Sequence, residues 1–225
     1  MKTITFYRRN EKAFTLIELL VVIAIIGLLA GLVVAIGGPA LRNARLKRAS
    51  VELKSLETII EEYKQKKGFY PPDNPKSSDT NQLFYELSGT IYRPGATPPD
   101  SATFQTVSGI GGVLDKNTLN TWFNTDGFVN STQDQNENPV FSQSFSPGQY
   151  AEVSSSPNKI VELLVCPVPG PNMVKNLNTG AELNPWNYNS SNPTNNPNSF
   201  DLWVDVSIGN KTNRICNWST TPIVL

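Results

Sequence analysis

The feature that most constrains this chain is a long apolar run that begins at Phe14 and reaches about Ile36. A helix of these roughly 23 residues would be ~35 Å long at ~1.5 Å per residue, which is enough to cross a ~30 Å hydrocarbon layer. Glu18 is the one ionisable side chain inside the run. A carboxylate in hydrocarbon costs at least ~2.5–3.5 kcal/mol, so an acid at such a position usually has a partner and a function.

The residues around the start of this run carry a recognisable pattern. A basic leader, residues 1–13, ends at the small residue Ala13, Phe14 opens the run, and Glu18 follows four positions later. Residues 14–27 read Phe-Thr-Leu-Ile-Glu-Leu-Leu-Val-Val-Ile-Ala-Ile-Ile-Gly. This stretch resembles the prepilin signal of type IV pilins and of type II secretion pseudopilins. It departs from that signal at Ala13, where the family usually has Gly.

The resemblance implies a processing pathway. A prepilin peptidase in the membrane would cut between Ala13 and Phe14 and methylate the new amine on Phe14, so the apolar helix would stay in the mature protein. In a growing fibre, Glu18 of one subunit would contact the positively charged Phe14 amine of its neighbour.

Two other interpretations of the apolar run remain open at this point. An ordinary transmembrane anchor would leave Glu18 unexplained. A secretory signal peptide could be cut at the small-x-small pair Ala35 and Gly37, but the run is longer than the ~7–15 residues of a signal-peptide core.

Charge sets the expected topology. The leader holds four of the 19 basic residues and one of the 19 acidic residues, so its removal leaves a net charge of −3. By the positive-inside rule the leader stays cytoplasmic. We therefore expect a single pass through the inner membrane, with the C-terminal domain in the periplasm. The mildly acidic body has no basic patch with interleaved aromatic residues, so a nucleic-acid partner is not expected.

The inventory of reactive side chains points away from an enzyme. The chain has no histidine, which removes His-based triads, general bases and metal ligands. No catalytic residues and no cofactor are expected. The two cysteines, Cys166 and Cys216, could form a disulfide in an oxidising compartment. The alternative is two buried free thiols.

Periodicity predicts one long helix from Phe14 to about Lys67. Apolar residues recur at alternating three and four positions from Leu46 to Tyr63, which indicates one buried helical face. The opposite face is expected to be solvated and to include Glu52. The sequence Gly37-Gly38-Pro39 predicts a kink rather than an end. Lys66-Lys67-Gly68 predicts the C-terminus of the helix.

Several short segments of the body are similar to the major pseudopilins of type II secretion. They are Gly68-Phe69-Tyr70-Pro71, the following residues 81–87, Asn184-Pro185-Trp186-Asn187-Tyr188, residues 199–209, and Ile215-Cys216-Asn217-Trp218. Members of this family often bind calcium after a late strand. Here Asp201, Asp205 and Asn210 offer oxygen ligands, although Lys211 stands next to them.

The segment of about 88–157 has no counterpart in that family. It is rich in Ser, Thr, Asn, Gly and Pro, which is typical of a long decorated loop. A short helix or turn is predicted within Thr118–Phe128. Strands are predicted at Ile160–Val165, Leu183–Tyr188 and Leu202–Ile208.

Together these features predict an α+β fold. A long N-terminal helix, with a membrane half over 14–36 and an amphipathic half over 37–67, would pack on a small antiparallel sheet in a globular domain of residues 68–225. The expected function is a pseudopilin that assembles with itself and with other pseudopilins into a short periplasmic fibre on an inner-membrane assembly platform. Two alternatives remain: a pilin of a type IV pilus, and a membrane-tethered binding module that uses the aromatic residues Tyr85, Trp122 and Phe128.

Overall fold

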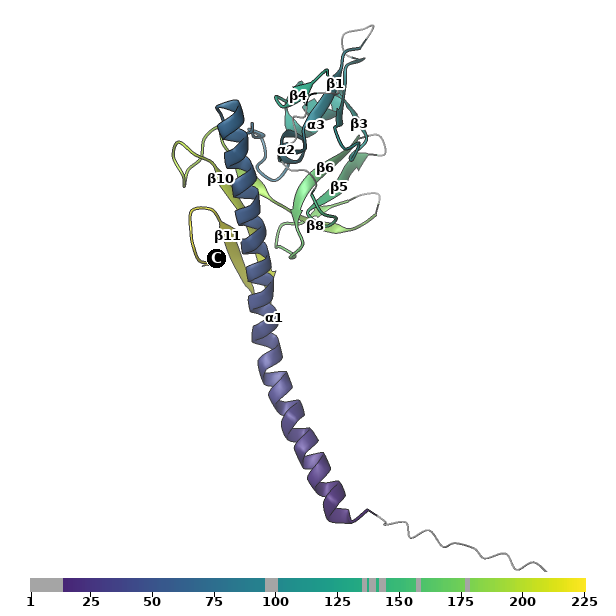
Figure 1. The fold of residues 1–225 in the computed structure, drawn as a ribbon, viewed down its shortest axis with the longest axis vertical. Helices are drawn as coiled ribbons and strands as arrows, with labels where there is room; N and C mark the ends of the chain where they lie inside the picture. The colour runs from purple at the N-terminus through teal and green to yellow at the C-terminus, as the bar shows by residue number, and fades with distance from the viewer. Residues whose placement is uncertain are drawn as a thin grey trace, which may run out of the picture. The chain divides into compact units, whose positions relative to one another are not determined.

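The computed structural model describes residues 14–95, 101–134, 137, 141, 145–156, 159–176 and 179–225. The chain divides into two units, Met1–Ala44 and Arg45–Leu225, which are described separately below. Helix α1 (Leu16–Lys67) supplies the described secondary structure of the first unit and the opening element of the second (Figure 1). The helix continues through Gly37, Gly38 and Pro39, so these residues do not end it.

The end of α1 lies where the sequence predicted it. Gly68 follows Lys67 with a φ of +87°, a left-handed conformation that glycine adopts without strain. Its N–H donates to the Lys64 carbonyl at 2.8 Å, which satisfies one of the last carbonyl groups of the helix.

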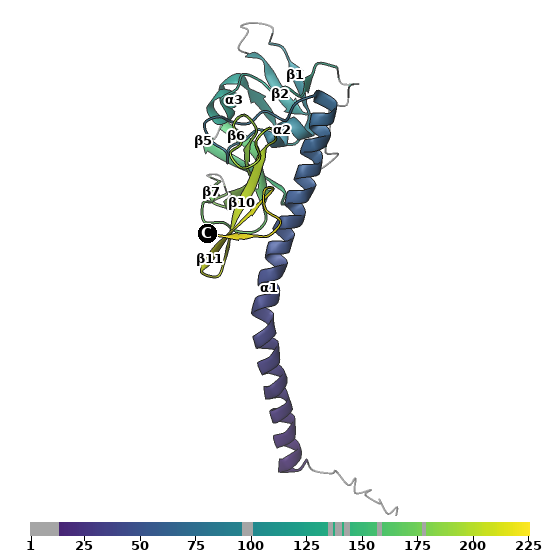
Figure 2. The ribbon, with the colours of Figure 1, turned by 90° about the vertical axis from the view of Figure 1, so that its left-hand side faces the viewer.

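The predicted apolar face of α1 is confirmed in the second unit. Ala49, Leu53, Leu56, Ile60 and Tyr63 are each at most 2% exposed. They belong to one core cluster together with the inward-facing residues of the C-terminal strands. The views in Figures 1 and 2 agree that this part of α1 lies beside β10 (Asp201–Ile208) and β11 (Lys211–Cys216). Burial of this stripe therefore joins helix and sheet in one body.

The C-terminal sheet has the strand order β12-β11-β10-β9, with β9 at Asn187–Asn189 and β12 at Ile223–Val224. All its pairings are antiparallel. In β10 the side chains of Leu202, Val204, Val206 and Ile208 are buried and alternate with half-buried residues. This alternation confirms the predicted strand over Leu202–Ile208.

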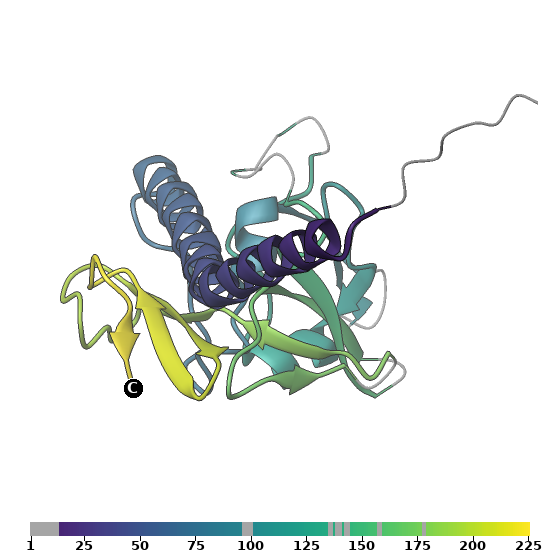
Figure 3. The ribbon, with the colours of Figure 1, turned by 90° about the horizontal axis from the view of Figure 1, so that it is seen from below.

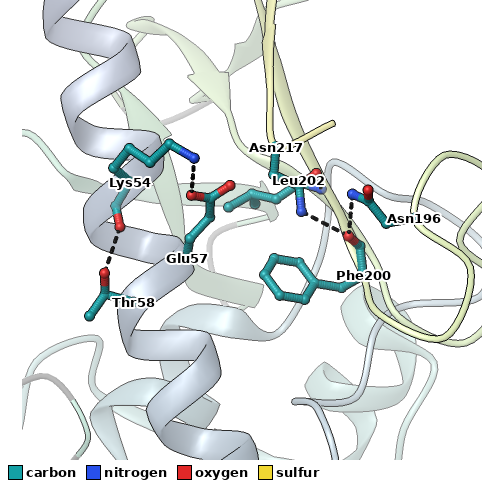
Figure 4. Close-up of polar contacts among 7 residues, drawn as sticks. All are labelled: Lys54, Glu57, Thr58, Asn196, Phe200, Leu202 and Asn217. Atoms are coloured by element: carbon teal, nitrogen blue, oxygen red, sulfur yellow. Dashed lines mark hydrogen bonds and ion pairs between the residues drawn. The ribbon is translucent and has the colours of Figure 1, made fainter. Parts of the chain in front are cut away.

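Asn217 fixes the start of β10. Its side-chain oxygen accepts from the Leu202 N–H at 3.0 Å, and its Nδ2 donates to the Phe200 carbonyl at 2.8 Å. Asn196 donates to the same carbonyl at 3.0 Å (Figure 4). On α1 nearby, Lys54 and Glu57 form an ion pair of 2.6 Å.

A second sheet has the order β5-β6-β8-β7. Its strands are β5 (Tyr150–Ser156), β6 (Lys159–Cys166), β8 (Glu182–Pro185) and β7 (Val174–Lys175). The register places Val153 opposite Val161 and Glu152 opposite Glu162. Strand β6 confirms the strand predicted at Ile160–Val165. Figure 3, seen from below, separates these green strands from the yellow C-terminal sheet.

The single strand predicted at Leu183–Tyr188 is wrong, because the chain changes sheet at Trp186. Residues before it pair with β6, and residues after it pair with β10. Pro185 has no N–H with which to continue a ladder. The Trp186 N–H instead donates to the Leu164 carbonyl at 3.0 Å, and the buried Trp186 side chain fills the corner.

The segment of 88–157 contains more regular structure than its composition indicates. Helix α2 (Leu83–Ser88) leads into a third sheet with the order β3-β2-β1-β4. Its strands are β1 (Thr90–Arg93), β2 (Thr103–Thr106), β3 (Val113–Asp115) and β4 (Ser131–Thr132), and helix α3 (Lys116–Phe123) follows β3. Helix α3 confirms the short helix predicted near Trp122, and Asp115 caps it by accepting from the Thr118 N–H at 2.7 Å.

Candidate functional site

The predicted processing junction lies at the edge of the described chain. Ala13 and the rest of the leader fall outside the described residues. Phe14 is described and 80% exposed, and α1 begins two residues later at Leu16. The helix thus starts almost directly after the predicted cleavage point.

Glu18 and Thr15 form reciprocal hydrogen bonds at the start of this helix. The Thr15 backbone N–H donates to Glu18 Oε2 at 2.8 Å, and the Thr15 hydroxyl donates to the same oxygen at 2.7 Å. In return, the Glu18 N–H donates to Thr15 Oγ1 at 3.3 Å. This reciprocal pair is a capping box, in which residues at the cap and at the third helical position satisfy each other's backbone donors.

The capping box adds a role for Glu18 that the sequence analysis missed. The spacing Thr-x-x-Glu before an apolar run is itself the signal for such a cap. Both Thr15 groups donate hydrogen bonds to Glu18 Oε2, and no donor among the described residues bonds to Glu18 Oε1. The second oxygen of the carboxylate can therefore receive a donor from another molecule while the cap stays intact.

The first part of α1 exposes apolar side chains on every side. Phe14, Leu16 and Ile17 are 69–80% exposed, and the large apolar residues from Leu19 to Leu32 are each 47–68% exposed. A helix that is apolar all round is covered in its working state by lipid or by other helices. Within the residues that the structure describes, no helix is long and apolar enough to cross a membrane.

Both cysteines are buried free thiols, which is the second of the two alternatives. Cys166 ends β6 and lies opposite Asn184, whereas Cys216 ends β11 and lies opposite Trp203. The two residues therefore belong to different sheets. Burial raises the pKa of the Cys166 thiol to about 12, so it is unreactive at neutral pH.

The two carboxylates among the predicted calcium ligands, Asp201 and Asp205, already accept hydrogen bonds from other groups of the protein. Asp205 makes a two-pronged ion pair with Arg214, with both nitrogen–oxygen distances at 2.8 Å. Asp201 is 1% exposed and accepts from the backbone N–H groups of residues 194–196 at 2.9 Å. Among the described residues no group of three or more His, Cys, Asp or Glu could hold a metal ion. Calcium binding here stays a prediction, and it would have to displace Arg214.

The aromatic residues considered for a binding surface lie in or against the core. Tyr85 is fully buried, Phe128 is 5% exposed, and Trp122 is partly buried. Tyr85 and Phe128 stack with ring centres 4.8 Å apart, and Phe104 meets Phe128 edge-on at 5.7 Å. These rings form the core of the 88–157 segment.

Buried carboxylates are the main polar feature that the sequence analysis missed. Glu86 is fully buried and accepts from the Tyr63 hydroxyl at 2.9 Å and from the N–H groups of Val129 and Asn130 at 2.8 and 2.9 Å. Glu52, expected on the solvated face, is only 8% exposed, because Gln149 and neighbouring residues cover it. Burial raises the pKa of Glu52 to about 7.

Comparison with known proteins gives one match, a family model that covers the N-terminal site. The family model for the prokaryotic N-terminal methylation motif matches residues 8–34, a stretch that includes the Ala13–Phe14 junction and Glu18. Neither the curated proteins nor the solved structures gave a match. The motif suggests anchoring in the inner membrane, and it implies processing by a prepilin peptidase and assembly with other pilin-like subunits. The chain therefore carries a prokaryotic N-terminal methylation motif, which supports a pilin-like structural subunit.

Proposed function

We propose that this chain is a pseudopilin of a type II secretion system. It is cleaved after Ala13, methylated on the Phe14 amine, anchored in the inner membrane by residues 14–36, and assembled into a short periplasmic fibre. The observation that carries the proposal is the coincidence of the methylation motif with an exposed Phe14 and a capped helix start. Neither a signal peptidase site near Gly37 nor a simple anchor accounts for that arrangement.

Glu18 is the proposed assembly contact. Both Thr15 donors bind its Oε2, so Oε1 can accept the Phe14 amine of a neighbouring subunit without opening the capping box. In a low-dielectric fibre core such a pair is stronger than in water, although desolvation of both charges offsets part of the gain. The pair would also fix the axial register of apolar helices that otherwise slide past one another.

Contacts within the body support the proposal of a pseudopilin. The segments that resemble pseudopilins meet one another: the Tyr188 hydroxyl donates to the Pro71 carbonyl at 2.8 Å, and Tyr70 packs edge-on against Phe200 at 5.0 Å. The 88–157 segment, which has no counterpart in that family, keeps the pilin alternative open. Burial of Tyr85 and Phe128 gives no support to a binding module built on these rings.

The capping box shapes the experiment. Glu18→Val removes both the carboxylate charge and the cap, so on its own it cannot separate assembly from helix stability. Glu18→Gln keeps an oxygen that can accept from Thr15 but cannot pair with an amine through a negative charge. Thr15→Val is the matched control, because it removes the cap hydroxyl and leaves the charge.

The readouts are membrane fractionation of the variant chains and recovery of sheared fibres. We expect Glu18→Gln and Glu18→Val to insert normally and to lose fibres, whereas Thr15→Val should insert and assemble with a reduced yield. Normal fibres from Glu18→Gln would refute the charge pair. Equal loss from all three variants would assign Glu18 to the cap alone. Electron microscopy of fibres carrying a tag on this subunit separates assembly from simple tethering.

A further inference from the structure

A pocket of about 340 Å³ lies between the β5–β6 hairpin and the loop that leads into β3. It is lined by Gly111, Gly112, Val113, Leu114, Thr118, Glu152, Ile160 and Glu162. Its volume lies within the ~300–1,000 Å³ typical of sites for small organic ligands. Apart from the two carboxylates and the Thr118 hydroxyl, its side chains are apolar.

Two acids lie side by side at this pocket. Glu152 of β5 and Glu162 of β6 are direct partners in the antiparallel register, so their side chains lie on the same face of the sheet. Like charges at such positions destabilise a sheet. A proton or a cation that reduces the negative charge of this pair therefore stabilises the pairing of the two strands.

Glu162 is the residue that points to a ligand. Its side chain is 7% exposed and lines the pocket, and its buried Oε2 atom has no hydrogen-bond partner among the described residues. Burial and, secondarily, the Glu152 charge raise the pKa of Glu162 to about 7. An unpaired buried carboxylate oxygen costs free energy that a cationic donor would recover.

Gly111 brings the loop onto this side chain. Its φ is +81°, and a Cβ at this position would lie 2.7 Å from the Glu162 Cγ and 3.2 Å from the Tyr85 hydroxyl. The backbone of the loop therefore packs directly on Glu162, and only glycine permits that approach. The Tyr85 hydroxyl, next to Gly111, accepts from the Glu162 N–H at 2.8 Å.

We propose that this pocket binds an organic cation, an ammonium or guanidinium group on a short aliphatic stem. The charged head lies between Glu152 and Glu162 and donates to the unpaired Oε2, and the stem packs on Val113 and Ile160. A divalent metal fits the donor set less well, because the described residues offer no group of three or more acids, cysteines or histidines here.

The test uses the full chain in a non-ionic detergent and a phosphate buffer without amines. Isothermal titration calorimetry is run with n-butylguanidinium and n-butylammonium, and with neutral n-butylurea as the uncharged control. Glu162→Gln preserves the volume and removes the charge. Glu182→Gln, at an exposed glutamate on β8, is the matched control. Near-UV circular dichroism verifies that each variant is folded, and Glu152→Gln provides a second variant of the site.

We expect at least one of the two cations to bind, and Glu162→Gln to weaken that binding by at least about tenfold, since truncating one partner of a buried charge pair costs that much or more. Glu182→Gln should bind like the parent chain. A blocked Gly-Arg-Gly peptide and free n-butylguanidinium separate the two sources of the cation. If the peptide and n-butylguanidinium both bind, the natural ligand can be an arginine side chain of another protein. If only n-butylguanidinium binds, the natural ligand is a small molecule.

Three results would overturn the proposal. The first is that neither cation binds. The second is that n-butylurea binds as tightly as n-butylguanidinium. The third is that Glu162→Gln and Glu152→Gln both bind the cation with the affinity of the parent chain. Calcium binding that requires Glu162, without binding of either organic cation, would overturn the assigned ligand class.

Discussion

Replacement of the buried Glu162 by glutamine should change how the stability of the body depends on pH. The pKa of Glu162 in the folded chain is about 7, against an ordinary value of 4.5. In the unfolded chain the carboxyl group loses its proton near the ordinary value. The folded state therefore binds the extra proton, and the stabilisation is complete below the unfolded pKa and disappears as the pH rises through 7.

The size of the effect follows from the shift. A shift from 4.5 to about 7 is worth ~3 kcal/mol at ~1.36 kcal/mol per pKa unit. Because the pocket opens to solvent, we reduce this figure to about 1–2 kcal/mol for the change between pH 5 and pH 8. Glu162→Gln should thus be close in stability to the parent chain at pH 5, and its advantage should grow by about 1–2 kcal/mol by pH 8.

Urea unfolding of the full chain in detergent, followed by near-UV circular dichroism at pH 5 and pH 8, measures the difference. Phosphate and acetate buffers avoid organic cations that could occupy the pocket. Glu182→Gln should reproduce the pH dependence of the parent chain. A Glu162→Gln variant that is less stable than the parent chain at pH 8 would refute the reasoning, because it would mean that the ionised carboxylate stabilises the fold.

Three further predictions concern the body. Glu86→Ala should destabilise it by about 3–5 kcal/mol, because it strands the Tyr63 hydroxyl and two backbone N–H groups, and Glu86→Gln should cost clearly less in the same urea assay. Leu56→Ala should cost about 2–5 kcal/mol through a cavity in the core, measured likewise. Calorimetric titration with calcium should give a stronger signal for Arg214→Gln than for the parent chain, because in the parent chain the Arg214 guanidinium binds both oxygens of Asp205. An equal signal would mean that Asp205 is not a calcium ligand.

The helical part of the fold could be predicted from local pattern. The stripe from Leu46 to Tyr63 repeats with the period of a helix, and Gly68 ends it, so neither feature needs knowledge of the rest of the chain. The same holds for β6 and β10, whose apolar residues stand in one short run or in alternation. The Thr-x-x-Glu spacing of the Thr15–Glu18 capping box is also a local signal, although the sequence analysis did not use it.

The 88–157 segment could not be predicted in this way. Its core consists of isolated rings such as Phe104, Phe123 and Phe128, which stand singly among polar residues. They cluster through contacts with one another and with Tyr85, most of them between residues far apart in the sequence. The burial of Glu162 likewise depends on a loop 51 residues earlier that packs on it through Gly111. No window of sequence contains both partners, so periodicity carries no sign of the site.

The contacts at the end of α1 set the order in which the body can be completed. The Pro71 carbonyl accepts from the Tyr188 hydroxyl and the Ser190 hydroxyl, 117 and 119 residues further along the chain. The helix emerges early in synthesis, but the turn that follows it gains its partners only when the last strands are available. Loops of that length close slowly, and until then the Leu53–Ile60 stripe lacks its cover. Until the last strands are available, the nascent body thus exposes an apolar helix face on which copies of the chain can associate.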